Sequence, residues 1–286
     1  MASMRDIKRR KQSITSTQQI TKAMKLVSTV KLQKAKSRAE QTDPYFNYMY
    51  NTVCSILAKS GNVNHPYLTA GLSDRKAVVV ITSNRGLAGG YNSNIVKLIT
   101  NNENFAKEDL DIYAIGGKGL EALTSKGYHV TEAYTDIIEN PVYADADALC
   151  KKVLASFAAG EVGEIYLAYT HFKNTVSQEP QLMKLLPVEL TEEDLENAQT
   201  DLLMNYEPNE EEALNMIIPK YVTSLFYGAL VESYASENGA RMQAMDSATS
   251  NAEEMIDDLT LKFNRARQAS ITQELTEIIA GANAIN

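Results

Sequence analysis

The chain has 286 residues, of which 44% are hydrophobic and 22% are charged, and its formal net charge is −8. This length is enough for one large domain, or for a domain with an extended appendage. The sequence lacks an apolar run of the roughly 18 to 20 residues that span a bilayer. It also lacks a secretory signal, and its two cysteines, Cys54 and Cys150, lie too far apart to indicate a zinc site. We therefore expect a soluble intracellular protein with two buried cysteines.

Charge is distributed unevenly along the chain. Residues 1–38 contain eleven lysines and arginines and one aspartate, which gives +10, so that the remaining residues carry −18. Such a polarised chain favours an electrostatic partner surface, on nucleic acid, on a membrane or on an acidic protein.

The first segment, from Met4 to about Leu57, contains no glycine and one proline, Pro44. Its composition and apolar spacing predict a long amphipathic helix that needs a partner helix, and Pro44 is expected to bend or locally interrupt it. The expected apolar stripe consists of Ile7, Ile14, Ile20, Met24, Val27 and Val30.

Residues 77 to about 190 have a different pattern. The apolar strands "AVVVIT", "DIYAIG" and "EIYLAYTHF" alternate with helical stretches near 93–101, 117–126 and 144–158. This alternation predicts a compact three-layer α/β domain with a mainly parallel sheet. The segment "QLMKLLPVEL" is expected to add an edge strand, with Pro187 near its end.

The helical pattern returns from Asn209 to Ile279, with Asn209 as the expected N-cap, Pro219 as a possible kink near the start and Gly281 as the expected stop. An unbroken helix over 220–280 would reach about 90 Å, far more than a small domain can cover. The two terminal helices are therefore expected to pair, antiparallel, as a coiled coil. Its seam on the second helix is predicted to be Ala252, Ile256, Leu259, Phe263 and Ala266. A thin face for close approach of the first helix is predicted from Ala235, Ser236, Gly239, Ala240, Ala244, Ser247, Ala248 and Ser250.

These patterns divide the chain into an N-terminal helix over 1–58, an α/β domain over 75–195 and a C-terminal helix over 209–286. Two glycine-rich turns follow strands of the central domain, "SNRGLAGG" at 83–90 and "IGGKG" at 115–119. Neither matches a dinucleotide-binding or P-loop pattern, and no lysine follows the last glycine of the first turn. Structural turns are favoured over phosphate binding.

The polar residues of the central domain do not form a recognisable catalytic or metal-binding motif. The three histidines, His65, His129 and His171, occur without the patterns of a serine hydrolase or a zinc protease. Asp145 and Asp147 are better explained as the polar start of a helix than as calcium ligands. We expect no catalytic residue, no cofactor and no metal in this chain.

The C-terminal segment is the most specific part of the sequence. It contains Arg265 and Arg267, then polar residues, then the uncharged tail "IIAGANAI", which suits the inside of a protein sleeve better than water. With "SNRGLAGGYN" at 83–92, "ITKAMKLVSTVKLQKA" at 20–35 and the whole stretch 240–285, the chain resembles the gamma subunits of bacterial F-type ATP synthases over essentially its full length.

The resemblance implies an antiparallel coiled coil of both termini inside a ring of alpha and beta subunits. It also implies a Rossmann-like α/β base that holds epsilon and contacts the membrane ring of c subunits. The chain would then be a rotor shaft at the cytoplasmic face of the cell membrane, coupling ion flow to ATP synthesis or hydrolysis on other chains. Implied contacts with the alpha/beta ring are Met24, Arg267, Gln268, Thr272 and Glu274, and implied contacts with the c ring are Tyr206 and Glu207.

Two other functions stay open from the residues alone. A nucleotide-binding α/β enzyme requires the glycine turns to hold phosphate, which their sequences disfavour. A nucleic-acid binder requires the basic N-terminal helix to be free, and residues 1–38 contain no aromatic side chain for stacking on bases.

Overall fold

The computed structural model describes residues 4–60, 65–69, 71, 73–188 and 210–285. The chain forms two compact units, one made of Met1–Ser28 with Met242–Asn286 and the other of Thr29–Arg241. The helix α1 (Met4–Ser60) and the helix α6 (Glu210–Ile285) each contribute to both units. The division into 1–58, 75–195 and 209–286 stays a prediction about domains.

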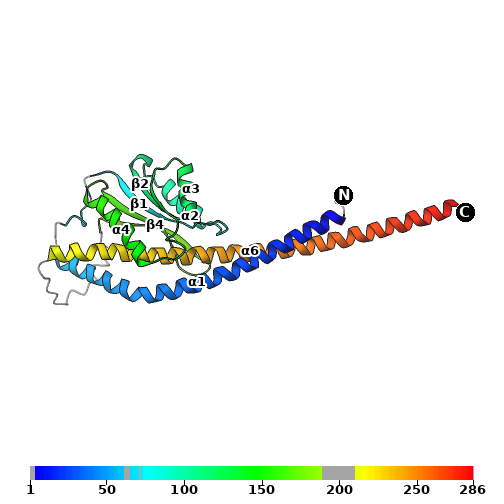
Figure 1. The fold of residues 1–286 in the computed structure, drawn as a ribbon, viewed down its shortest axis with the longest axis horizontal. Coiled ribbons are helices and arrows are strands. Elements are labelled where there is room, and N and C mark those ends of the chain that lie inside the picture. Colours follow the sequence, from blue (N-terminus) through cyan, green and yellow to red (C-terminus); the bar gives the residue numbers. More distant parts are fainter. Residues whose placement is uncertain (1–3, 61–64, 70, 72, 189–209, 286) are drawn as a thin grey trace. The chain divides into compact units, whose positions relative to one another are not determined.

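The larger unit contains a five-stranded sheet in the order β3-β2-β1-β4-β5. The pairs β1 with β2, β1 with β4 and β2 with β3 are parallel, whereas β5 joins β4 antiparallel. The predicted mainly parallel α/β sheet and its edge strand are confirmed, and the antiparallel direction of β5 is a feature that was not predicted; the fold is Rossmann-like (Figure 1). The elements are β1 (Lys76–Ile81), α2 (Tyr91–Thr100), η1 (Lys107–Asp109), β2 (Leu110–Ile115), α3 (Gly117–Ser125), β3 (Val130–Tyr134), α4 (Tyr143–Ala158), β4 (Glu164–Phe172) and β5 (Gln178–Leu186).

Alternate residues of the central strands serve two separate cores, because successive side chains of a strand point to opposite faces. On β1, Val78 and Val80 pack with α2 and α3, whereas Val79 and Ile81 pack with α4 and α6. Continuous burial along β1 explains why its sequence is an unbroken apolar run. The edge strand β3 was not predicted, since its sequence "VTEAY" is only five residues long and contains neither an apolar run nor a regular alternation of polar and apolar residues.

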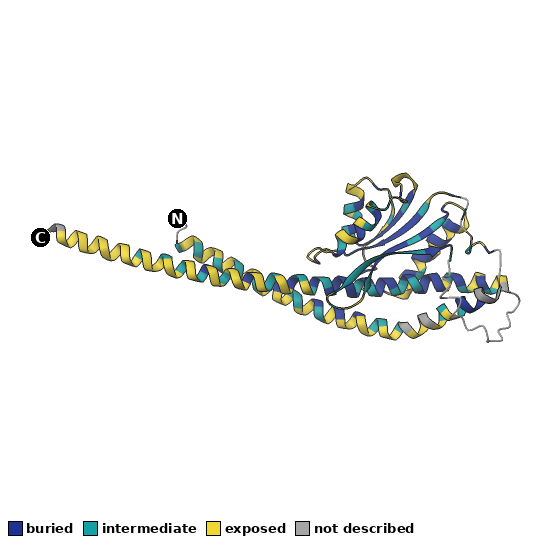
Figure 2. Cartoon of the chain, turned by 180° about the vertical axis from the view of Figure 1, so that it is seen from behind, coloured by how far each residue is buried: buried dark blue, intermediate teal, exposed yellow. Residues whose placement is uncertain are grey.

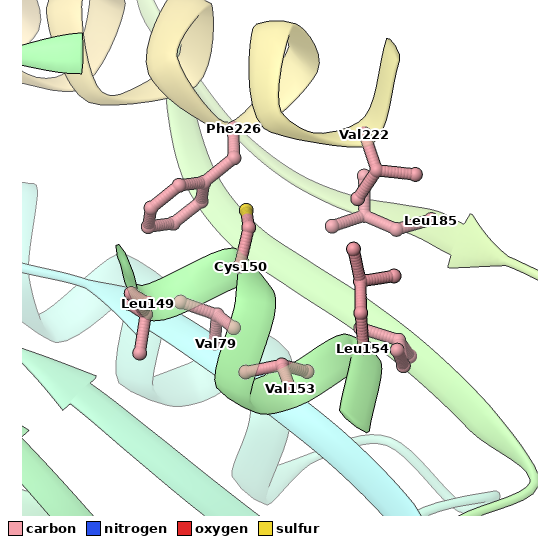
Figure 3. Close-up of a pocket in the computed structure, with 9 residues that line it drawn as sticks. Val79, Leu149, Cys150, Val153, Leu154, Leu185, Val222 and Phe226 are labelled. Atoms are coloured by element: carbon pink, nitrogen blue, oxygen red, sulfur yellow. The ribbon is translucent and has the colours of Figure 1, made fainter. Parts of the chain in front are cut away.

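Cys150 occupies the core between the sheet and α6. Its side chain extends from α4 toward Phe226 and Val222 of α6, beside a void of about 10 Å³ (Figure 3). Both cysteines are buried, as predicted, and neither is part of a disulfide among the described residues. Burial raises the pKa of the Cys150 thiol to about 12.

In the smaller unit, α1 and α6 pair antiparallel. The Thr21 and Thr249 hydroxyls are 2.8 Å apart, and Lys25 Nζ lies 2.5 Å from Asp246 Oδ1, so rising residue numbers on one helix match falling numbers on the other. Buried or half-buried positions on α6 recur at spacings of three and four, as in a coiled coil. They are Met242, Met245, Thr249, Ala252, Ile256, Leu259, Phe263, Ala266 and Ser270, which confirms the predicted seam.

The predicted stripe on α1 is partly wrong. Ile7 and Ile14 are half-buried, but Ile20, Val27 and Val30 are 59, 57 and 52% exposed. The seam of α1 instead continues through polar residues such as Thr21 and Ser28, both of which are buried. A hydroxyl can be buried between two helices when it has a hydrogen-bonding partner there, as Thr21 has. The apolar residues of α1 therefore need not face α6.

The first part of the predicted thin face of α6 has a different neighbour, whereas Ala244 and Ala248 are half-buried in the smaller unit. Ala235, Ser236 and Gly239 are buried against the sheet, where Ser236 Oγ donates a hydrogen bond to Thr170 O at 3.1 Å. An added Cβ on Gly239 would meet the Phe172 ring at 3.4 Å. Small residues therefore allow α6 to approach the sheet in this stretch.

The described helices are not interrupted where breaks were predicted, and a bend at Pro44 or a kink at Pro219 stays a prediction. The helix α1 continues through Pro44, and α6 continues through Pro219 and past Gly281 to Ile285. A glycine inside a helix lowers the stability of the helix by only about 1 kcal/mol relative to alanine. The helix α6 can therefore continue through Gly281. The expected N-cap Asn209 lies outside the described residues.

The helical stretch Glu211–Asn283 contains a segment with a mean hydropathy of 1.2. By length and composition alone this helix could cross a membrane, whereas we expected no such stretch from the sequence. Over half of that segment, 56%, is buried inside the fold. Its composition is therefore that of a helix that packs against a protein core.

Candidate functional site

The turn "SNRGLAGG" connects β1 with α2 and is held by its own side chains. Ser83 N donates to Asn92 Oδ1 at 2.9 Å, and Ser83 Oγ donates to Arg85 O at 2.6 Å. Leu87 and Gly89 have positive φ angles of 64° and 56°. Both residues are in the left-handed region, which Gly89 adopts without strain and which Leu87, carrying a Cβ, adopts at a cost.

An ion pair of α6 lies against the carbonyl groups of this turn. Arg241 donates to Arg85 O at 3.3 Å and to Gly86 O at 3.4 Å, and its Nη1 lies 2.6 Å from Glu237 Oε1. Both side chains are only 11% exposed. Burial raises the pKa of Glu237, with Arg241 acting in the opposite direction. The turn thus docks onto α6 through its carbonyl groups, and carbonyl groups do not bind anions.

Tyr91, the first residue of α2, strengthens this docking. Its buried hydroxyl donates to Ser233 O of α6 at 3.2 Å. Burial and the nearby charge of Glu237 raise its pKa. The pair of Arg241 and Glu237 and the contact of Tyr91 were missed from the sequence, although a basic and an acidic residue four apart among small residues, in "SENGAR", was a usable signal.

The second turn, "IGGKG", is explained by close packing on Thr82. An added Cβ on Gly116 would lie 2.1 Å from Thr82 O, and one on Gly119 would lie 2.5 Å from Thr82 Oγ1. Gly119 N donates to the same hydroxyl at 2.9 Å. The glycines of this turn make room for β1, in agreement with the structural interpretation of the sequence.

The histidines and acidic residues of the larger unit have separate structural partners. His65 is buried 3.1 Å from Asn215 Oδ1, His171 lies 2.7 Å from Glu232 Oε2, and His129 is exposed. Asp145 lies in the first turn of α4, as predicted. Within the described ranges, no three histidine, cysteine or acidic side chains are grouped as a metal site would need.

The predicted contact residues lie in two separate places on the smaller unit. Met24 is half-buried on α1, next to Lys25, which pairs with Asp246 of α6. Arg267 follows Asp246 by 21 residues, which corresponds to about 31 Å of helix. The structure therefore does not bring Met24 and Arg267 together.

Beyond the seam, α6 is exposed on all sides. Arg267, Gln268, Thr272 and Glu274 are exposed, and every described side chain from Ile271 to Asn283 is exposed (Figure 2). The Thr272 hydroxyl donates to Gln268 O at 2.9 Å, and Ser270 Oγ lies 3.4 Å from Glu274 Oε1. Tyr206 and Glu207 lie outside the described residues.

Large apolar side chains accompany these polar positions. On α1 within the smaller unit, Ile20, Leu26 and Val27 are exposed, and on α6 beyond residue 270 the exposed large apolar residues are Ile271, Leu275, Ile278 and Ile279. We call these seven residues the outer apolar set. Apolar side chains gathered on solvent-facing helices are typical of a surface that another protein covers.

The chain was compared with known proteins. The family model described as ATP synthase matches residues 3–285. The chain is 67% identical to the ATP synthase gamma chain of Lachnoclostridium phytofermentans over the full length of both. It is 45% identical to that of Alkaliphilus metalliredigens, over 99% of this chain and 98% of the relative. It is 42% identical to the gamma chain of Acetobacterium woodii that is named as sodium ion specific, over 99% of each.

Solved structures show the same likeness. The central stalk and c ring structure of the Tetrahymena thermophila mitochondrial ATP synthase contains a chain 28% identical, with a TM-score of 0.59 over 80% of this chain and 99% of that one. A chain in the Euglena gracilis mitochondrial ATP synthase is 19% identical, with a TM-score of 0.70 over 99% of this chain and 94% of that one, which supports the fold alone.

Proposed function

This chain belongs to the ATP synthase gamma-chain family, and on that premise we propose that it is the non-catalytic rotor shaft that couples ion flow through the c ring to ATP synthesis or hydrolysis at the beta subunits. The observation that carries the proposal is the match over the whole chain, at 67% identity to a gamma chain of equal extent. The complex would hold the shaft at the cytoplasmic face of the cell membrane, as a peripheral subunit.

The exposed end of α6 supports a place inside a ring of alpha and beta subunits. Residues 271–283 expose every side chain, and the outer apolar set would be buried by such a sleeve. We assign Arg267, Gln268, Thr272 and Glu274 to contacts with this ring. Met24 would lie where α1 passes acidic loops of beta, which suits the excess of positive charge in residues 1–38.

Under the same proposal, the other partners of the rotor bind the α/β domain and the segment that follows it. Epsilon would bind this domain, and the segment with Tyr206 and Glu207 would contact the polar loops of the c ring. A shaft of this kind acts through contacts that differ between the states of each beta subunit, because a conformational change needs differential interaction.

Copurification with the complex tests the assignment directly. A tagged chain, expressed in cells that lack their own gamma subunit, should bring down alpha, beta, epsilon and c in a particle that hydrolyses ATP. Cysteine substituted for Tyr206 should crosslink to c and not to the outer surface of alpha. A chain that never associates with alpha and beta would contradict the proposal.

A nucleotide-binding enzyme is the alternative. It is disfavoured because the carbonyl groups of the first turn accept hydrogen bonds from Arg241, leaving that cation engaged. We expect calorimetry on the purified chain to find no micromolar site for ATP or NAD. A site of that affinity would favour the alternative.

A further inference from the structure

A large cleft in the unit Thr29–Arg241 has no role assigned to it in the proposed function. It encloses about 940 Å³ and is lined by α1, the start of α4, the strands β4 and β5, and α6. Sites for small molecules usually enclose about 300 to 1,000 Å³ and combine apolar walls with a few polar groups. The cleft therefore has the size and the composition of a ligand site.

Aromatic rings form the walls of this cleft. Tyr45, Tyr143, Tyr169 and Tyr227 all line it, and the rings of Tyr143 and Tyr227 meet edge to face with their centroids 5.7 Å apart. Flat aromatic groups pack favourably on such rings, beyond the gain from burial alone. An aromatic ligand suits these walls better than an aliphatic one.

Among the described residues, the cleft contains one lysine, Lys220, and two carboxylates, Asp147 of α4 and Glu232 of α6. Asp147 lies 2.6 Å from Lys151, and Glu232 lies 2.7 Å from His171, so both carboxylates already have partners. Lys220 is exposed and, within the part of the chain that the structure describes, has no acidic side chain at ion-pair distance. Lys220 and Glu232 are twelve residues apart, or about 18 Å of helix. An anion would therefore bind at the Lys220 end.

Gly228 forms part of the cleft wall in the first third of α6. A glycine there lowers helix stability relative to alanine. Glycines often persist in helices where a neighbour leaves no space, as at Gly239, but an added Cβ on Gly228 would meet nothing within 4 Å. Close packing does not explain this glycine, whereas an open cleft does, because any larger side chain would project into it.

We propose that this cleft binds a small aromatic anion, whose ring system lies against Tyr143 and Tyr227 and whose anionic group pairs with Lys220. Gly228 keeps the wall open for the ring system. The proposal concerns only the unit Thr29–Arg241 and does not depend on a role in a rotary complex.

Binding can be measured with 8-anilinonaphthalene-1-sulfonate, an aromatic sulfonate. The chain contains no tryptophan, so Tyr45→Trp places a single fluorescent reporter at the cleft. Titration of the full chain should change the tryptophan emission saturably. The uncharged analogue N-phenyl-1-naphthylamine should bind more weakly. Emission that changes linearly, without saturation, would overturn the proposal.

Variants in the Tyr45→Trp background identify the site. Gly228→Met should weaken binding at least about tenfold, whereas Gly281→Met, the same substitution at another open position of α6, should leave it unchanged. Gly228→Met should also raise the Tm by about 2 °C, because it removes a helical glycine, which shows that the variant is folded. Equal affinities in the two glycine variants would exclude the cleft as the site.

The role of Lys220 is tested by charge reversal. Lys220→Glu should weaken binding of the sulfonate about fivefold, since an exposed ion pair contributes modestly and its reversal adds repulsion. It should leave binding of the uncharged analogue unchanged. Lys97→Glu, at an exposed lysine of α2, is the matched control and should have no effect. If Lys220→Glu binds the sulfonate like the parent, the cleft does not recognise anions and the proposal is wrong.

Discussion

Glu164, at the start of β4, lies between two lysines. Its carboxylate is 2.9 Å from Lys184 Nζ and 3.4 Å from Lys76 Nζ, and it accepts a hydrogen bond from Tyr166. Burial acts in the opposite direction, but the hydrogen bonds from Lys184 and Tyr166 and the charges of both lysines lower the pKa of Glu164. A lowered pKa means that the ionised form stabilises the fold.

This stabilisation is present above the ordinary pKa of 4.5 and is lost as the pH falls through the lowered pKa of the folded protein. We expect Glu164→Gln to reduce the free energy of unfolding by about 1 kcal/mol at pH 7 and by less at pH 3. Urea unfolding at both pH values measures this. Glu179→Gln, at an exposed pair with Lys173, is the control and should change little. A loss that is equal at the two pH values would contradict the prediction.

Cys150 leads to a prediction about reactivity. Its thiol is buried and its pKa is raised to about 12, so that almost no thiolate forms at pH 8. Iodoacetamide at pH 8 should therefore leave Cys150 unmodified in the folded chain and label it in urea, as peptide mass spectrometry would show. Rapid labelling of the folded chain would mean that the core between α4 and α6 opens readily.

At the scale of the elements, the docking of the first glycine turn onto α6 depends on a buried ion pair. Removing one member of such a pair leaves an uncompensated charge, which costs about 3 to 5 kcal/mol. We expect Arg241→Met to lower the free energy of unfolding by this amount at pH 7. Lys262→Met breaks an exposed pair with Asp258 on the same helix and should cost under about 0.5 kcal/mol.

The pH dependence of Arg241→Met follows from Glu237, whose pKa is already raised in the fold by burial. Loss of Arg241 would raise it further, so the penalty applies above the ordinary pKa of 4.5, where the unfolded chain is ionised. Below this pH the carboxyl is neutral in both states. The destabilisation should therefore shrink between pH 7 and pH 4. A penalty that persists undiminished at low pH would indicate lost packing and not lost charge compensation.

How far the sequence predicts these elements depends on the kind of signal. The buried run "AVVVIT" and the seam from Ala252 to Ala266 were found because burial on both faces and heptad spacing leave regular patterns. The spacing of apolar residues did not predict the buried face of α1, where Thr21 is buried and Ile20 is exposed. One sequence does not show that a polar residue is buried between two helices with a hydrogen-bonding partner. It also does not distinguish an apolar residue that faces another protein from one that faces the chain's own core.

The site is predicted less completely than the fold. Met24 and Arg267 were chosen through family resemblance, and the structure places them on the smaller unit about 31 Å of helix apart, without showing what they contact. Partner contacts cannot be read from burial within one chain. Tyr91 and Arg241 were missed because their contacts join residues about 140 to 160 positions apart.

At the scale of the whole molecule, the proposed shaft must bind its ring and also release it in each orientation. If Met24 faces acidic loops of beta, as we propose, Met24→Lys would add a charge there and should impair coupling more than assembly, because contacts that are too strong in one orientation slow rotation. Subunit composition, ATP hydrolysis and ATP-driven ion pumping of the reconstituted complex measure the two effects. Normal pumping per ATP hydrolysed would show that Met24 is not a contact.

A substitution at Arg267 tests the other end of the proposed contact surface. Because its side chain is exposed, Arg267→Glu should leave the Tm of the isolated chain unchanged. In the assembled complex, the reversed charge should lower ATP turnover several-fold, through loss of a partner carboxylate contact. Parental turnover in the variant complex would remove Arg267 from the surface, whatever the result for Met24.

The outer apolar set is expected to make the binding of this chain to the ring depend on temperature. Attraction between apolar surfaces is largely entropic near 25 °C and weakens on cooling. If Ile20, Leu26, Val27 and the apolar residues of the α6 tip supply much of the contact with the ring, the complex should hold this chain less tightly at 4 °C than at 25 °C. Equilibrium dissociation measured at the two temperatures should show this difference, and Val27→Ser, which removes exposed apolar surface from α1, should reduce it. Chilling would then release the shaft from a complex that is intact when warm.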